Sequence, residues 1–154
     1  MHIRPITPPD ADEWSRMRTD LWPDTNDGHK AEIAAYFDGT SIDVVEVLVI
    51  DREAEAKGLG GFLELNLRNF AEGCLLPEVP YVEAWLVDED LRNQGWGRSL
   101  MQAAEKWASA RGYEQLASDT TPDNEKSISA HKALGFKEVE RVVCFLKDLN
   151  SKNE

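Results

Sequence analysis

Cysteine is scarce in this sequence. The two cysteines, Cys74 and Cys144, form neither a CxxC pair nor a spacing typical of metal ligands. This spacing argues against a zinc site and against a redox motif. We therefore expect two reduced, inert thiols in a cytoplasmic protein that binds no metal.

Long apolar runs are also missing. No run approaches the roughly 20 apolar residues of a membrane-spanning helix. The N-terminal stretch MHIRPITPPDADEW lacks the apolar segment of a signal peptide. With 42% hydrophobic and 30% charged residues, the chain has the composition of a soluble globular protein that does not associate with membranes. We expect one domain over residues 1–150, followed by a disordered tail at 151–154.

Basic residues are few. The chain has 17 Lys and Arg against 29 Asp and Glu, which gives a formal net charge of −12. A nucleic-acid partner is therefore unexpected, because binding phosphates requires a basic surface. An acidic protein attracts cations, so a small polycationic amine is a suitable ligand. The acidity is equally compatible with a role in solubility alone.

Two familiar phosphate-binding motifs are absent as well. The chain has no GxGxxG and no Gly-Lys-Ser/Thr. It does have an apolar run, Tyr81 to Val87, followed by an acidic turn and by the glycine loop Arg92-Asn93-Gln94-Gly95-Trp96-Gly97 before an expected helix. Strand, glycine loop and helix form an arrangement in which backbone N–H groups and a helix N-terminus can hold a phosphate. The plain alternative is a glycine turn before a surface helix.

Hydrophobic periodicity predicts the order β-α-α-β-β-β-α-β-α-β-β, which is typical of a mixed α/β fold with helices on both faces of one sheet. The expected strands are 2–6, 44–50, 61–68, 81–87, 115–119 and two within 136–147 that turn near Glu140 and Arg141. The strand at 115–119 should run parallel to 81–87, because a helix crosses between them. The last helix should start at Thr121 and Pro122 and end at Leu134, before Gly135.

The glycine loop, after a strand that ends Leu86-Val87-Asp88, resembles the pyrophosphate-binding loop of the GNAT acetyltransferases. Further segments resemble one group of them, the aminoglycoside 6'-N-acetyltransferases, over about residues 1 to 149. These segments are Leu21-Trp22-Pro23, Glu83, Ala117-Ser118-Asp119-Thr120, Pro122-x-Asn124, His131-x-Ala133-Leu134-Gly135-Phe136 and Val139-Glu140-Arg141-Val142. The resemblance is weakest from Thr25 to Lys57. It implies a single-domain GNAT fold with a mixed, mostly antiparallel sheet.

The resemblance also implies an activity, the transfer of the acetyl group of acetyl-CoA to the 6'-amino group of aminoglycoside antibiotics, which inactivates them and confers resistance. Cofactor contacts are then expected along three parts of coenzyme A. They come from Trp85, Leu86 and Val87 on the pantetheine arm, from Arg92, Asn93, Gln94, Gly95, Trp96, Gly97 and Arg98 at the pyrophosphate, and from Asn124 near the thioester.

The acceptor pocket implied by the resemblance is lined by Trp22, Glu83, Asp119 and Glu140, with Phe70 above it. Carboxylates and an aromatic wall suit a polycation with many hydroxyls. In related enzymes the Phe70 position can be Tyr, so one polar contact is missing here. Each residue also has a plain alternative role. Trp22 can be a core aromatic, Glu83 a solvent-facing strand residue, Asp119 a helix cap and Glu140 an exposed turn residue.

Acetyl transfer requires that the attacking amine loses a proton. We expect Asp119 or Glu83 to accept it, directly or through water. Neither cysteine lies in a nucleophile motif, which favours direct attack without an acetyl-enzyme. His131 stands where many GNAT enzymes have a tyrosine that protonates the leaving thiolate. It can serve as that acid or be a packed surface histidine.

Other functions stay open at this point. The acceptor of a GNAT enzyme can be another cationic amine, such as a polyamine or a peptide N-terminus. The chain can also be a regulatory domain that binds coenzyme A without catalysis, or an acidic interaction module. The apolar segment Val142 to Leu146 is suited to strand pairing between subunits, so we expect a homodimer.

Overall fold

The structure is a computed structural model that describes residues 1–24, 28–53 and 58–150. The predicted disordered tail at 151–154 lies outside the described residues. The chain divides into two compact units, Met1–Asp119 and Thr120–Glu154, and each is described by itself.

The N-terminal unit is built on a five-stranded sheet in the order β1-β2-β3-β4-β5. The strands are β1 His2–Pro5, β2 Glu46–Asp51, β3 Leu59–Arg68, β4 Val79–Val87 and β5 Ala117–Ser118. The first three pairings are antiparallel, and β4 and β5 are parallel. This confirms the predicted mixed, mostly antiparallel sheet and the parallel pairing of 115–119 with 81–87, although β5 is shorter than predicted.

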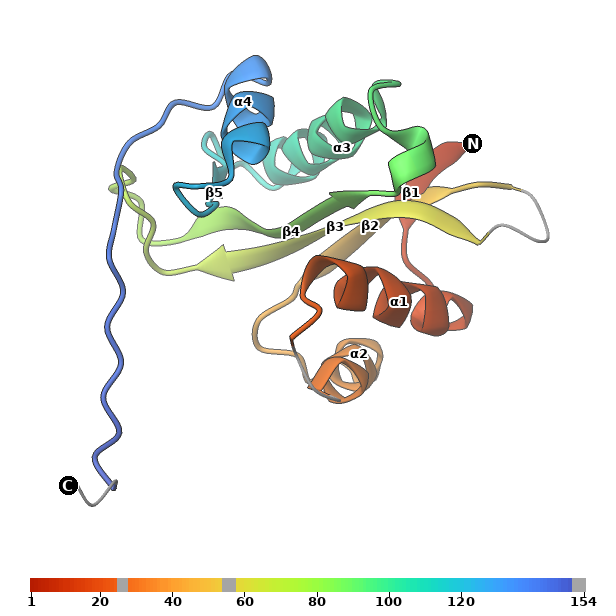
Figure 1. The fold of residues 1–154 in the computed structure, drawn as a ribbon, viewed down its shortest axis with the longest axis horizontal. Coiled ribbons are helices and arrows are strands. Elements are labelled where there is room, and N and C mark those ends of the chain that lie inside the picture. Colours follow the sequence, from red (N-terminus) through yellow and green to blue (C-terminus); the bar gives the residue numbers. More distant parts are fainter. Residues whose placement is uncertain (25–27, 54–57, 151–154) are drawn as a thin grey trace. The chain divides into compact units, whose positions relative to one another are not determined.

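Helices cover both faces of this sheet. α1 (Ala11–Leu21) and α2 (Gly28–Asp38) pack on one face, and α3 (Trp96–Ala110) crosses the other (Figure 1). Short 3₁₀ turns, η1 (Pro8–Asp10) and η2 (Glu89–Leu91), precede α1 and follow β4. Trp14 and Met17 of α1 are fully buried, as their helical spacing predicts. With Val47, Val49 and Phe62 they form the main core.

A β-bulge interrupts the pairing of β3 with β4. Glu64 pairs with Ala84 and Leu65 with Val82, so Glu83 is an extra residue without an opposite partner. A bulge bends its strand and redirects the side chain of the extra residue. The sheet is therefore irregular at Glu83, one of the residues that the sequence assigns to the acceptor pocket.

The C-terminal unit contains α4 (Glu125–Ala133). The predicted start at Thr121 and Pro122 is wrong, because Asn124 is the N-cap and its side chain accepts a hydrogen bond from the Ser127 backbone N–H at 3.1 Å. Asparagine is among the strongest N-cap residues, so the helix begins where that bond forms. The end of the helix before Gly135 is as predicted, with φ of +93° at Gly135.

The two strands predicted within 136–147 are wrong for this chain on its own. Residues 137–148 carry no strand in the described part of this unit. The apolar side chains of Val143, Phe145 and Leu146 are exposed. A strand needs a neighbour to pair its N–H and C=O groups, and a β-prone sequence does not supply one. The segment therefore has the composition of a strand without a partner strand in its own unit.

Candidate active site

The loop between β4 and α3 has two residues in the left-handed region of backbone space. Asn93 has φ of +60° and Gly95 has φ of +89°, and Gly95 is the N-cap of α3. Asparagine and glycine are the residue types that adopt this conformation readily. The first N–H groups of a helix have no partner within it, so those of α3 can bind an anion. The loop therefore has the backbone of an anion-binding turn.

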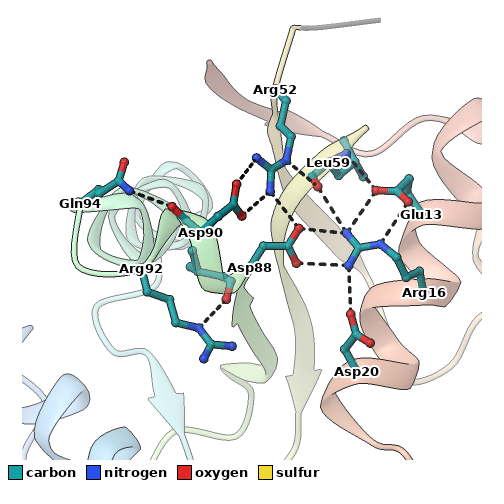
Figure 2. A network of polar contacts seen from close by, with 10 residues as sticks. Glu13, Arg16, Asp20, Arg52, Leu59, Asp88, Asp90, Arg92 and Gln94 are labelled. Atoms are coloured by element: carbon teal, nitrogen blue, oxygen red, sulfur yellow. Dashed lines mark hydrogen bonds and ion pairs between the residues drawn. The ribbon is translucent and has the colours of Figure 1, made fainter. Parts of the chain in front are cut away.

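An ionic network fixes the start of this loop (Figure 2). Arg16 of α1 donates to both oxygens of Asp88, at 3.2 and 3.0 Å. Arg52 donates to Asp88 at 3.1 Å and to both oxygens of Asp90, at 2.9 and 2.8 Å. The Gln94 side chain donates to the Asp90 carbonyl at 2.9 Å. Because Asp88 directly follows β4, these bonds connect α1, the end of β2 and the glycine loop.

Gly97 lies against Trp85 of β4. A β-carbon at Gly97 would be 3.2 Å from Cζ2 of Trp85, which is closer than almost all real contacts of this kind. Glycine therefore allows the first turn of α3 to lie directly beside β4. The same closeness brings the helix N-terminus to the end of the strand.

A cavity of about 700 Å³ opens on the α1 and α2 side of the sheet, beside β3 and β4. It includes the carboxylates of Glu32, Asp43, Glu64 and Glu83 and the aromatic ring of Trp22. The other charged or polar residues of its lining are Arg18, His29, Thr40, Ser41, Asn66 and Arg68. Four carboxylates against two arginines make this a predominantly acidic cavity.

Glu83 of the bulge is held by two neighbours on β3. Arg68 donates through Nε to Oε1 at 2.6 Å and through Nη2 to Oε2 at 2.7 Å. The side-chain amide of Asn66 donates to Oε1 at 3.1 Å. The Glu83 side chain is 21% exposed. It is therefore a fixed and partly buried carboxylate.

Asp119 follows β5 and is exposed, yet one of its oxygens is engaged. The Tyr81 hydroxyl donates to Oδ2 of Asp119 at 2.8 Å. Burial raises the pKa of Tyr81, and the hydrogen bond to Asp119 raises it further, so the phenol stays neutral. The guanidinium carbon of Arg68 lies 3.7 Å from the centre of the Tyr81 ring. Contacts thus run from Glu83 through Arg68 and Tyr81 to Asp119, across three neighbouring strands.

A buried ion pair lies in the wall of the cavity. Arg18 of α1 donates to Glu64 of β3 at 2.6 and 3.1 Å, and both side chains are nearly inaccessible, at 5% and 1% exposed. Trp14 Nε1 also donates to Glu64, at 2.8 Å. Burial lowers the pKa of Arg18, but hydrogen bonds and the charge of Glu64 outweigh it, so the pKa lies above its ordinary value.

The aromatic wall of the cavity rests on this pair. The guanidinium of Arg18 lies 5.4 Å from the ring centre of Trp22. Trp22 also stacks on His29, with 6.2 Å between ring centres. Trp22 is half-buried, so it packs against the core and still presents part of its ring to the cavity. The ring position is thus set by α1 and α2 together.

A family model described as "Acetyltransferase (GNAT) family" matches residues 11–136. The chain belongs to the GNAT acetyltransferase family. Among curated relatives of this GNAT chain, the aminoglycoside N(6')-acetyltransferase type 1 of Klebsiella aerogenes is 42% identical over 149 residues, which cover 96% of each chain.

Solved GNAT structures agree with this assignment. AAC(6')-Iy, solved with the bisubstrate analogue CoA-S-monomethyl-acetylneamine, superposes with a TM-score of 0.82 at 30% identity over 96% of this chain and 97% of its own. The aminoglycoside 6'-N-acetyltransferase AAC(6')-Ih of Acinetobacter baumannii has the same TM-score and identity, over 97% and 99% of the two chains. The predicted single-domain GNAT fold is thereby confirmed.

The predicted site residues of this GNAT chain lie in different parts of the structure. Trp22 and Glu83 line the cavity, whereas Asp119 and Phe70 are not among the described residues of its lining. Phe70 is exposed just after β3. The residues predicted for the cofactor, apart from Asn124, lie together on β4, the glycine loop and the first turn of α3. Asn124 and Glu140 belong to the C-terminal unit, as does His131, whose Nδ1 lies 2.7 Å from the Ser127 carbonyl oxygen.

Sequence reasoning missed four polar residues of the site: Arg18, Glu64, Arg68 and Tyr81. A signal existed for two of them. Arg18 lies one turn after Trp14, on the apolar face of α1, and Glu64 interrupts the apolar run of β3. A charge at a core position implies a buried partner. The pattern does not identify which residue that partner is.

The next three observations concern metal ligands, cysteines and membrane-spanning helices. In the described ranges no group of three or more His, Cys, Asp or Glu residues is arranged to hold a metal ion. Both cysteines are free thiols, half-buried at Cys74 and exposed at Cys144. No helix among the described residues is long and apolar enough to cross a membrane.

Proposed function

We propose that this GNAT acetyltransferase transfers the acetyl group of acetyl-CoA to the 6'-amino group of aminoglycosides and so inactivates them. The observation that carries the proposal is the acidic cavity beside Trp22 and Glu83, in a chain with an aminoglycoside N(6')-acetyltransferase relative at 42% identity. An aminoglycoside carries several ammonium groups, which the carboxylates of the cavity can pair with, and ring faces, which Trp22 can cover.

The glycine loop fits coenzyme A by its shape and its backbone. Left-handed residues at Asn93 and Gly95 and the N-terminus of α3 suit a pyrophosphate. The backbone of Trp85, Leu86 and Val87 borders the same loop. We propose that these residues hold the cofactor together with Arg92, Gln94, Trp96, Gly97, Arg98 and Asn124. Bound there, acetyl-CoA supplies an acyl thioester, and the residues of the chain orient the acceptor towards it.

Replacing Gly97 by valine is expected to raise the KM for acetyl-CoA about tenfold, equivalent to ~1.4 kcal/mol, with little change in the KM for kanamycin. Valine would collide with Trp85, which lies 3.2 Å from the position of the first added carbon. Steady-state kinetics with each substrate varied in turn measures both constants. Ala110→Val, at an exposed position of the same helix, is the matched control and should leave both unchanged. An unchanged KM for acetyl-CoA in Gly97→Val contradicts the placement of the cofactor.

For the proton transfer, we propose that Asp119 is the general base and Glu83 an anchor for the substrate. Glu83 already accepts three hydrogen bonds, two of them from the Arg68 guanidinium. Both of its oxygens are therefore already engaged by donors on β3, which suits an anchor better than a base. Asp119 accepts a hydrogen bond from the neutral Tyr81 hydroxyl, and its side chain is exposed. The attacking amine can therefore reach this carboxylate directly or through water. Trp22 and Glu140 complete the proposed acceptor site, with Phe70 above it and His131 as a candidate acid.

Direct attack of the amine is favoured over an acetyl-enzyme. The Sγ atom of Cys74 lies 3.1 Å from Oε1 of Gln115. An amide oxygen is not a general base, so this contact does not activate the thiol as a nucleophile. Incubating the protein with radiolabelled acetyl-CoA in the absence of amine should leave no label on the protein. A stable acetyl-protein that is consumed on adding kanamycin contradicts direct attack.

The acceptor is tested by measuring CoA release with kanamycin, tobramycin, spermidine and a short peptide. Turnover with the two aminoglycosides, and acetylation of the 6'-amine located by NMR, is the expected result. Turnover with spermidine or the peptide alone would favour a GNAT enzyme for another cationic amine. A calorimetric signal for CoA binding without turnover on any amine would favour a regulatory CoA-binding domain.

We also propose a homodimer, supported by the exposed apolar segment 142–146, which has strand composition and no partner strand among the described residues of its own unit. Sedimentation at micromolar concentration should give twice the mass of 17.3 kDa. Replacing Phe145 and Leu146 by aspartate should shift the species to the monomer. A wild-type chain that sediments only as a monomer contradicts the dimer. A cytoplasmic location and the lack of nucleic-acid or membrane partners stay predictions from composition.

A further inference from the structure

Arg68 presents a positive charge in a cavity whose proposed ligand is a polycation. Of the two arginines in the lining, Arg18 is 5% exposed and is held by Glu64 in the protein interior. Arg68 is 37% exposed and lies at the end of β3. A cationic substrate therefore meets Arg68 and does not meet Arg18.

Arg68 already binds both carboxylate oxygens of Glu83, the atoms with which a substrate ammonium group would pair. Its guanidinium contacts both carboxylate oxygens, at 2.6 and 2.7 Å. This two-bond geometry is the strongest form of an arginine–carboxylate pair. An ammonium group brought close to the guanidinium would be repelled by its like charge. Glu83 can bind an incoming cation well only if Arg68 moves aside.

Arg68 has a second contact in the same position, the ring of Tyr81. Its guanidinium carbon lies 3.7 Å from the centre of the Tyr81 ring, and a cation over an aromatic ring is stabilised there. The hydrogen bonds to Glu83 are the main cause of the raised pKa of Arg68, and the more distant negative charge of Asp119 adds to it. Arg68 can therefore give up Glu83 and retain the ring face as well as an acidic neighbour.

We propose that Arg68 is a specificity determinant, which competes with a substrate cation for Glu83 and is displaced only by substrates with several ammonium groups. A polycation pairs first with another carboxylate of the cavity, such as Asp43. Its reactive amine then competes with Arg68 at a high local concentration. A monoamine has no such anchor and must displace Arg68 unaided, so it is rejected. This inference rests on the proposed aminoglycoside activity.

The test compares two substrates that share the same reacting sugar, kanamycin and 6-amino-6-deoxyglucose, which carries a single ammonium. In Arg68→Gln we expect kcat/KM for the monoamine to rise about tenfold through KM, and that for kanamycin to change less than about threefold. Arg68→Lys keeps the charge and should retain most of the discrimination. Arg111→Gln makes the same change of charge on an exposed arginine that stacks on Trp107, and it should alter neither constant.

The Arg68→Gln substitution made in the Glu83→Gln protein tests whether Arg68 changes the discrimination between the two substrates through Glu83. In Glu83→Gln the carboxylate is gone, so adding Arg68→Gln should no longer favour the monoamine. If Arg68→Gln lowers kcat/KM for both substrates equally, Arg68 instead holds Glu83 in place and the proposal is overturned. An unchanged ratio of the two kcat/KM values overturns it as well.

Binding measurements distinguish a failure of this proposal from a failure of the proposed acetyltransferase activity. Calorimetry of kanamycin and the monoamine with wild type and Arg68→Gln gives the same ratio from dissociation constants, without turnover. If wild type binds kanamycin but does not acetylate it, the proposed function fails while the binding ratio still tests Arg68. If neither ligand binds to either protein, Arg68 does not guard a cation site and the proposal is overturned.

Discussion

Replacing Asp119 by asparagine is expected to lower kcat for kanamycin acetylation by about 10²- to 10⁴-fold, with KM for both substrates within about threefold. Asparagine matches aspartate in shape and can still accept the hydrogen bond from Tyr81, which lies 2.8 Å away. It cannot accept a proton from the attacking amine. The loss should therefore fall on kcat and spare binding. Steady-state kinetics monitoring CoA release separates the two constants.

Glu83→Gln is the comparison that assigns the two carboxylates. Its amide keeps a hydrogen-bonding oxygen but loses the charge that pairs with Arg68. We expect KM for kanamycin to rise more than kcat falls, because Glu83 binds the cation and does not take its proton. A full loss of kcat in Glu83→Gln, together with a kcat within about fivefold of wild type in Asp119→Asn, would reverse the two roles.

The sequence predicts those parts of the site that depend on residues close together in the chain. The run Tyr81 to Val87 forms β4, and Gly95 and Gly97 begin α3 as their positions predict. Each of these features depends on residues a few positions apart, so their pattern is visible in the chain. The order of elements in the N-terminal unit follows from the same local signals, and the helix that crosses between β4 and β5 makes these strands parallel.

The polar partners of the site could not be predicted in this way. Arg68 and Glu83 are 15 residues apart and meet only because β3 and β4 pair with a bulge at Glu83. Arg18 and Glu64 are 46 residues apart and meet because α1 packs on β3. No periodicity reports a contact of this range. The same limit explains the C-terminal error, since residues 142–146 have strand propensity and the strand depends on a partner that the local sequence does not specify.

Breaking the buried pair of Arg18 and Glu64 is expected to destabilise the protein strongly. Glu64→Gln should lower the free energy of unfolding by about 3–5 kcal/mol, because a buried guanidinium loses its charged partner. Glutamine can still accept the hydrogen bond of Trp14 Nε1, so the loss reports the charge and not the bond alone. Urea unfolding followed by tryptophan fluorescence measures the change, and the slope with denaturant should stay constant.

The double substitution Arg18→Met with Glu64→Gln isolates the charge effect. It removes both charges and keeps the acceptor of the Trp14 Nε1 hydrogen bond, so it should recover most of the stability lost in Glu64→Gln. The ring of Trp22 would then lose the guanidinium that lies 5.4 Å from its centre, and KM for kanamycin should rise while the fold is kept. A loss below about 1 kcal/mol in Glu64→Gln contradicts this account. It would mean that Glu32, the other carboxylate paired with Arg18, suffices to stabilise the buried charge.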